Sequence, residues 1–153
     1  MFTQVKIREE DQHAQRFLWR DGDMKKPIEH YVMASMTFGA VCSPCCAEYV
    51  KNQNAKEFAH IYPEAAEAII YKHYVDDFVC SFKNEEEATC LCKEIVHIHS
   101  KAGFELRGFL SNCQNLEVAL NPTVSVNSSN PINMEKQATT DKILGMFWNK
   151  HDD

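Results

Sequence analysis

The chain has 153 residues, of which 44% are hydrophobic and 25% are charged, a composition typical of one globular domain with a buried core. Its formal net charge of −6 disfavours a free-standing nucleic-acid binder, because such proteins carry a basic surface. The sequence contains neither an apolar run of membrane-spanning length nor a basic-then-apolar leader, so it predicts no membrane partner and is compatible with the cytoplasm.

The first forty residues predict short strands separated by turns. Two apolar–polar stretches, 2–8 and 14–20, flank an acidic turn at 9–11. Glycine and proline then mark a loop at 21–27. A strand is expected over 31–36, and it leads into Thr37-Phe38-Gly39.

A helix is expected between Ser43 and Pro63. Ser43 suits the N-cap, Pro44 suits the first helical position, and Pro63 lies beyond the end. The apolar face is imperfect because the middle of this segment is polar. The residues expected on that face are Ala47, Val50, Phe58 and Tyr62.

The chain has seven cysteines, an odd count that predicts reduced thiols. Three lie together before and within the expected helix, at Cys42, Cys45 and Cys46. Two more, Cys90 and Cys92, lie close in sequence to His97 and His99. Zinc sites usually present two separated Cys/His pairs at close spacing. Zinc binding is therefore one hypothesis, and buried thiols are the favoured alternative.

Two adjacent carboxylates, Asp76 and Asp77, follow His73-Tyr74-Val75 between two apolar runs. The runs, 68–71 and 78–82, have the length and composition of strands, so a hairpin is expected with both aspartates at its tip. Neighbouring carboxylates repel one another unless a cation lies between them, and divalent metals prefer oxygen ligands. The alternative is a solvated turn, because Asp is a common turn residue.

The clearest predicted element is a helix that starts after Asn84 and stops at Gly103. Asn84 can cap it, and three glutamates fill its first turn, where the helix dipole favours negative charge. Apolar residues then recur at helical spacing up to Ala102.

The remaining chain predicts strands and loops. We expect a strand at 104–107, a turn around Ser111-Asn112, a mobile loop over 121–140 and a last strand at 143–148. Strands mixed irregularly with helices indicate an α+β fold, with an antiparallel sheet covered by helices on one face.

Five motifs, in order, resemble the reverse transcriptase palm of retrotransposons, most closely that of the Pao (BEL) type. Tyr74-Val75-Asp76-Asp77 is similar to the Tyr-x-Asp-Asp box of this family. The other four are Phe2-Thr3-Gln4-Val5; Met36-Thr37-Phe38-Gly39 with Ser43-Pro44 and Ala47; Gly103-Phe104-Glu105-Leu106-Arg107 with Ser111-Asn112; and Leu144-Gly145-Met146-Phe147-Trp148. The resemblance covers nearly the whole chain.

The resemblance implies an RNA-directed DNA polymerase whose palm holds two magnesium ions, with manganese as a substitute. Asp76 would bind metal directly and Asp77 would support it. Phe2 would block a ribose 2′-hydroxyl, Phe38 and Gly39 would border nucleotide and template, and Tyr74 would lie near the primer end. The implied partners are an RNA or DNA template with its primer, deoxynucleotides, and the remaining segments of a polyprotein.

Two departures from the family pattern bear on activity. The first catalytic aspartate of the family lies five residues before the aromatic matched by Phe2, whereas the chain begins at Met1. Gly108-Phe109 replaces a Lys-Trp pair, so Arg107 is the nearest basic substitute. We therefore expect residues 1–153 to be a partial palm without fingers or thumb, inactive alone. The alternative is a retroelement remnant that acts as a binding or structural module.

Overall fold

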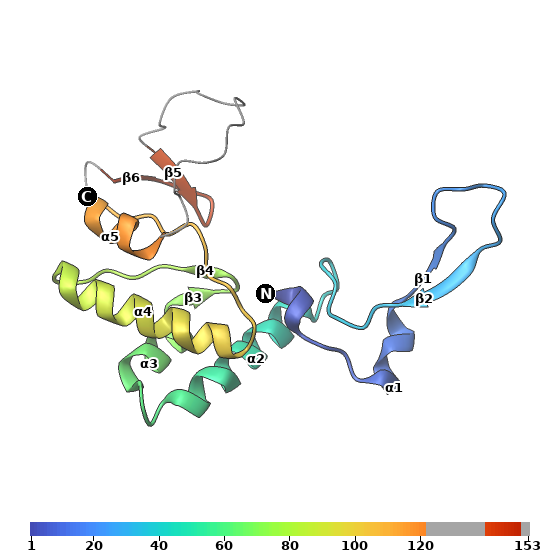
Figure 1. The fold of residues 1–153 in the computed structure, drawn as a ribbon, viewed down its shortest axis with the longest axis horizontal. Helices are drawn as coiled ribbons and strands as arrows, with labels where there is room; N and C mark the ends of the chain where they lie inside the picture. The colour runs from blue at the N-terminus through green and yellow to red at the C-terminus, as the bar shows by residue number, and fades with distance from the viewer. Residues whose placement is uncertain (122–139, 151–153) are drawn as a thin grey trace.

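Three helices form the body of the molecule in the computed structural model, which describes residues 1–121 and 140–150 (Figure 1). They are α2 (Ser43–Phe58), α3 (Pro63–Tyr71) and α4 (Glu85–Lys101). Small apolar residues let the helices approach closely, which buries the larger side chains among them. The main core consists of Ala55, Ala65, Ala66, Ala68, Ile69, Ile95 and Ile98.

Helix α2 begins almost where the sequence predicts. Cys42, rather than Ser43, is the N-cap, and Pro44 lies in the first turn. The Ser43 hydroxyl donates a hydrogen bond of 2.7 Å to the carbonyl oxygen of Thr37 instead of capping the helix. Buried Ser43 therefore ties the start of α2 to the loop that precedes it.

The apolar run 68–71 is helical, so its prediction as a strand is wrong. It forms the end of α3, which has Pro63 in its first turn. Ala66 and Ala68 favour a helix, and the run is too short for periodicity to separate a buried helix from a strand. Packing decides the outcome, because Ile69 is fully buried against the neighbouring helices.

Helix α4 confirms its prediction at both ends. The Asn84 side chain accepts a hydrogen bond of 2.8 Å from the backbone N–H of Glu87. Gly103 has a φ of +70°, the left-handed conformation with which helices commonly end. No helix within residues 1–121 or 140–150 is long and apolar enough to cross a membrane.

The N-terminal part contains η1 (Phe2–Gln4), α1 (Glu9–Gln12), η2 (His13–Gln15), β1 (Arg16–Trp19) and β2 (Glu29–Val32). The predicted turn at 9–11 is thus a short helix, and the strand predicted over 31–36 starts earlier and ends at Val32. The β1–β2 hairpin extends away from the helical body (Figure 1). All its strand residues are exposed.

The α+β class is confirmed, with strands paired antiparallel in three two-stranded sheets among the described residues. The second pairs β3 (His73–Tyr74) with β4 (Asp77–Phe78), and the third pairs β5 (Thr140–Ile143) with β6 (Met146–Asn149). The single strand predicted over 143–148 is wrong, because Leu144 and Gly145 both take positive φ and turn the chain. Helices cover one side of β3–β4, where Phe78 packs on the main core.

The segment after α4 is extended without pairing as a strand, contrary to the prediction for 104–107. Its alternating pattern reflects burial instead: Phe104 is buried beside Val5 and Met36, and Leu106 packs on the main core. Helix α5 (Gln114–Leu120), which the sequence did not predict, follows Ser111-Asn112.

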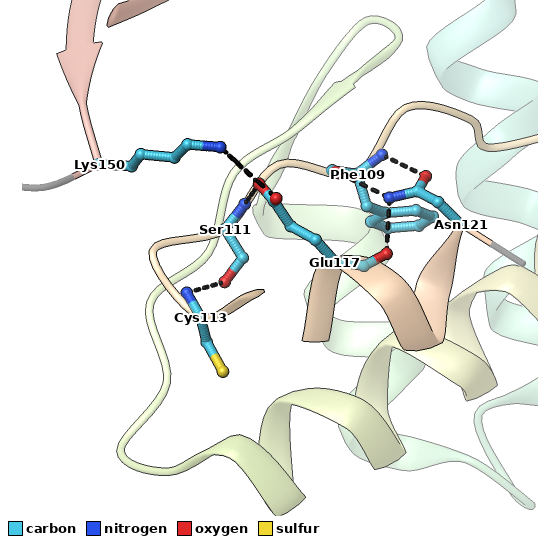
Figure 2. A network of polar contacts seen from close by, with 6 residues as sticks. All are labelled: Phe109, Ser111, Cys113, Glu117, Asn121 and Lys150. Carbon is cyan, nitrogen blue, oxygen red and sulfur yellow. Dashed lines mark hydrogen bonds and ion pairs between the residues drawn. The ribbon is translucent and has the colours of Figure 1, made fainter. Parts of the chain in front are cut away.

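Polar contacts join α5 to the segment before it and to Lys150, the residue after β6 (Figure 2). Asn121 accepts a hydrogen bond of 3.0 Å from the N–H of Phe109 and donates to the carbonyl oxygens of Phe109 and Glu117. The Glu117 carboxylate accepts from the N–H of Ser111 at 2.8 Å and pairs with Lys150 at 3.2 Å. Most of the predicted 121–140 loop lies outside the described residues.

Candidate functional site

The two aspartates lie on a tight hairpin, as predicted, but its turn starts one residue earlier. His73 pairs with Phe78 and Tyr74 pairs with Asp77, so Val75 and Asp76 form the two-residue turn. The N–H of Val79 donates to the carbonyl oxygen of Lys72 at 3.0 Å and extends the ladder. Asp76 therefore occupies the tip, whereas Asp77 is the first residue of β4, which corrects the expectation that both lie at the tip.

Val75 has an unusual backbone conformation for its residue type. Its φ is +57°, and a β-branched side chain rarely adopts positive φ because Cβ crowds the carbonyl group. Two-residue hairpins of this kind usually place glycine at the first turn position. Strained backbone is concentrated at functional sites. The φ of Val75 therefore indicates a functional turn, and this argument does not depend on the neighbouring carboxylates.

The side chains of Asp76 and Asp77 are both exposed. Carboxylate oxygens are the right donors for magnesium or manganese. Within residues 1–121 and 140–150, however, no group of three or more His, Cys, Asp or Glu side chains could hold a metal ion. The pair therefore fits such an ion in donor type but supplies only part of a binding site.

Tyr74 and His73 have opposite environments. Tyr74 is exposed, next to the turn, whereas the His73 ring stacks on His99 at a centroid distance of 4.9 Å. Phe78 contacts the His73 ring, also at 4.9 Å. The side of the hairpin that carries His73 is therefore fixed to the body, and its tip remains accessible.

The charge state of this stack follows from burial. Burial, the nearby His99 and the charge of Lys51 lower the pKa of His73 to about 3. Burial also lowers the pKa of His99 to about 4, although His99 Nδ1 donates to the carbonyl oxygen of Ile95. Both rings are thus neutral at pH 7, which allows them to stack without charge repulsion.

Phe2 and Phe38, predicted from separate motifs, lie in contact. Their ring centroids are 4.8 Å apart at an interplanar angle of 56°. The isolated β-bridge between Lys6 and Ser35 brings the two segments together. Phe2 is buried at 7% exposure, whereas Phe38 is 73% exposed, so the pair offers one fixed ring and one accessible ring.

Gly39 is required for its backbone conformation. Its φ is +89°, and a Cβ at this position would meet no atom within 4 Å. A larger residue would thus be strained by backbone conformation and not by crowding. The open space beside Gly39 leaves the exposed ring of Phe38 accessible.

A row of buried rings connects the two predicted parts of the site. Phe104 packs with Val5, three residues after Phe2, and its ring meets His99 edge-on at 6.2 Å. His99 in turn stacks on His73, the first residue of the hairpin. His99 was expected only as one of the histidines in the zinc hypothesis. The signal for its packing role is its position four residues after Ile95, on the apolar face of the helix.

The cysteines do not support the zinc hypothesis. Cys42, Cys45 and Cys46 are exposed free thiols, so the expectation that thiols are buried fails for this group and holds for Cys92. His97, near Cys92 in sequence, contacts Phe58 and Tyr62. The histidines therefore face aromatic rings.

Arg107, expected as a substitute basic residue, is exposed and pairs with Glu105. Its hydrogen bond lowers the pKa of the Glu105 carboxyl group, and Glu105 raises the pKa of Arg107. The guanidinium group is accessible but already has an anionic partner.

A comparison with protein families matches residues 1–108 to the family described as reverse transcriptase (RNA-dependent DNA polymerase). The matched region includes η1, the loop at Phe38, the hairpin and all of α4. Searches of curated proteins and of solved structures found no match.

Proposed function

The chain belongs to the reverse transcriptase (RNA-dependent DNA polymerase) family, and we propose that it is part of a palm that transfers nucleotides to a primer 3′-hydroxyl. The observation that carries this proposal is the hairpin at His73–Phe78, where Asp76 lies in the turn and Asp77 follows it. Its inner side is fixed by His73 and its carboxylates remain exposed.

Asp76 and Asp77 are proposed as metal ligands, with Asp76 binding directly. Divalent ions such as magnesium or manganese, when bound in a complete site, activate the attacking hydroxyl and neutralise charge on the phosphate. The anchored hairpin keeps the two carboxylates in one place, which this chemistry requires because small displacements are costly.

Phe2, Phe38 and Gly39 are proposed to border the incoming nucleotide and the template. The buried Phe2 ring is suited to exclude a ribose 2′-hydroxyl, because the contact with Phe38 and the surrounding core restrict its movement. The exposed Phe38 ring offers an apolar surface for a base or sugar. Tyr74, exposed beside the turn, is proposed to contact the primer end.

We also propose a Pao-type retrotransposon origin, on the similarity of Gly103–Arg107 and Ser111-Asn112 to that lineage. Such an origin makes the other polyprotein segments partners of this chain. Family membership implies a nucleic-acid template and nucleotide substrates.

The 153-residue chain is proposed to be inactive alone. Two-metal chemistry needs a further carboxylate beside Asp76 and Asp77, and in the family pattern this is an aspartate five residues before the position of Phe2. The proposal thus requires a segment that supplies this side chain.

Primer extension tests both statements. The chain is assayed alone and fused to a reverse transcriptase N-terminal segment that places an aspartate five residues before Phe2. We expect extension only from the fusion, and a loss of roughly 100-fold or more on Asp76→Asn, the scale of one lost electrostatic contact to a transition state. Asp11→Asn, an exposed aspartate in α1, is the matched control and should retain activity.

Extension by the unfused chain would disprove its inactivity. An active fusion that keeps its rate after Asp76→Asn would disprove the role of the hairpin. If the Asp11→Asn control also loses activity, the loss reflects the fold and the assignment of Asp76 fails.

A further inference from the structure

Three thiols lie within five residues at the start of α2, and the polymerase proposal gives them no role. Cys42, Cys45 and Cys46 are all exposed and none is in a disulfide. The first two form a Cys-Ser-Pro-Cys sequence. The two-residue spacing and the helix start together distinguish this pair from an isolated surface cysteine.

The backbone brings Cys42 and Cys45 within reach of one another. Cys42 is the N-cap, yet it has helical dihedral angles, with φ of −82° and ψ of −15°, and its carbonyl oxygen accepts from the N–H of Cys46 at 2.9 Å. Helical geometry therefore applies from Cys42 onward and separates the Cα atoms of Cys42 and Cys45 by about 5 Å. Disulfides span Cα distances of about 4.4–6.8 Å, so the bond needs little backbone movement.

Cys46 is the least suited of the three to react. Desolvation, the charge and side-chain hydrogen bond of Cys42, and the charge of Cys45 raise the pKa of its thiol, although the side chain is exposed. Because the thiolate is the attacking species, a raised pKa slows exchange at neutral pH.

We propose that Cys42 and Cys45 form a reversible dithiol site that undergoes exchange with low-molecular-weight disulfides such as oxidised glutathione. One thiolate attacks a sulfur of the oxidised glutathione, which breaks that S–S bond, forms a mixed disulfide and releases one glutathione thiolate. The second thiol of the pair loses its proton and attacks the mixed disulfide, which releases the other glutathione. The protein dithiol is oxidised to a disulfide, and the oxidant is reduced to two thiols.

The site is linked to the loop that contains Phe38 and Gly39. Ser43 lies between the two cysteines, is buried, and donates to the carbonyl oxygen of Thr37 at 2.7 Å. A disulfide that closes this turn restrains Ser43, and through its hydrogen bond it restrains the loop. Oxidation is therefore expected to slow amide hydrogen exchange at Phe38 and Gly39.

Glutathione redox buffers test the proposal on the purified 153-residue chain. After equilibration and alkylation of free thiols, peptide mapping should show a Cys42–Cys45 disulfide that disappears in reduced glutathione. Cys42→Ser and Cys45→Ser should each abolish this species. Cys46→Ser is the matched control, an exposed thiol of the same helix turn, and should retain it.

Circular dichroism checks that each serine variant is folded, and alanine at the same position replaces serine in any variant that is not. The proposal is overturned by a disulfide between Cys42 and Cys46, by a mixed disulfide that never resolves, or by three thiols that stay reduced in oxidised glutathione. Unchanged hydrogen exchange at Phe38 and Gly39 on oxidation would remove the link to the loop.

Discussion

The imidazole rings of His73 and His99 stack with centroids 4.9 Å apart and planes 19° apart. His73 is the first residue of the hairpin that carries Asp76 and Asp77, and His99 lies in α4. The stack therefore fixes the proposed catalytic hairpin to the longest helix of the described chain. Both rings are neutral at pH 7, so we expect the stack to weaken when acid protonates them.

Replacing His73 by phenylalanine should stabilise the protein. Both ring nitrogens of His73 are buried without a hydrogen-bond partner in the described part of the chain, and such groups reduce stability. His73→Phe keeps a ring against Phe78 and His99 and removes both nitrogens, so the free energy of unfolding in urea at pH 7 should rise by about 1 kcal/mol. His60→Phe, at an exposed position, should change it by less than about 0.5 kcal/mol. Destabilisation by His73→Phe would contradict this account.

Stability should decrease as the pH falls below the ordinary histidine range. The pKa of His73 is lowered from 6.5 to about 3 and that of His99 to about 4, so the unfolded chain binds protons before the folded chain does. Their contribution is complete above pH 6.5 and is lost progressively as the pH falls toward 3–4. Between pH 7.5 and 5, the wild type should lose about 1–2 kcal/mol more than His73→Phe. Parallel pH–stability curves for the two proteins would refute the shifted pKa of His73.

The buried ion pair of Lys51 with Glu48 should respond unequally to loss of either partner. Lys51 is 1% exposed, and its Nζ lies 2.7 Å from Oε1 of Glu48. Glu48→Gln leaves the buried charge of Lys51 without its partner and should lower the free energy of unfolding by about 2 kcal/mol. This value lies below the range for fully buried pairs because Glu48 is partly exposed. Lys51→Met removes the charge and should be nearly neutral.

The same lysine affects the histidine stack. The charge of Lys51 lowers the pKa of both His73 and His99, so Lys51→Met should raise both values. Titration of the imidazole C–H resonances by NMR measures this effect. Unchanged histidine pKa values in a folded Lys51→Met variant would show that the charge does not act on the stack.

Glycine at position 75 should relieve strain in the turn. Val75 has a φ of +57°, which costs a β-branched residue more than it costs glycine. Val75→Gly should therefore raise the free energy of unfolding by about 1 kcal/mol, after the entropic cost of glycine is subtracted. Val41→Gly, at a fully exposed residue without positive φ, should have the opposite sign. If both variants lose stability equally, the turn at Val75 is not strained.

The stability of the contacts around α5 should depend on both the donor and the acceptor of the Asn121 side chain. It accepts from the N–H of Phe109 and donates to the carbonyl oxygens of Phe109 and Glu117. Asn121→Asp keeps the acceptor and loses the two donors, so it should cost about 1–2 kcal/mol in thermal unfolding. Asn112→Asp, at an exposed position, is the control. Unchanged hydrogen exchange at the Phe109 amide would show that the acceptor is kept, and equal stability of the two variants would contradict the role of the donors.

The helix α4 and the hairpin at Asp76 could be predicted from the sequence because local interactions define them. The Asn84 side chain caps a backbone group three residues away, and Gly103 ends the helix through its own φ. By contrast, the end of α3 was predicted as a strand, because a four-residue apolar run fits either structure until its packing is known.

The sequence alone determined which chemical groups are present: adjacent carboxylates at Asp76 and Asp77, and aromatic rings at Phe2 and Phe38. Only the tertiary structure decided that Val75 and Asp76 make the turn, that Phe2 meets Phe38, and that His73 rests on His99. Caps and turns depend on residues a few positions apart, so sequence patterns reveal them. Ring contacts join residues separated by tens of positions, and burial of the whole chain selects them.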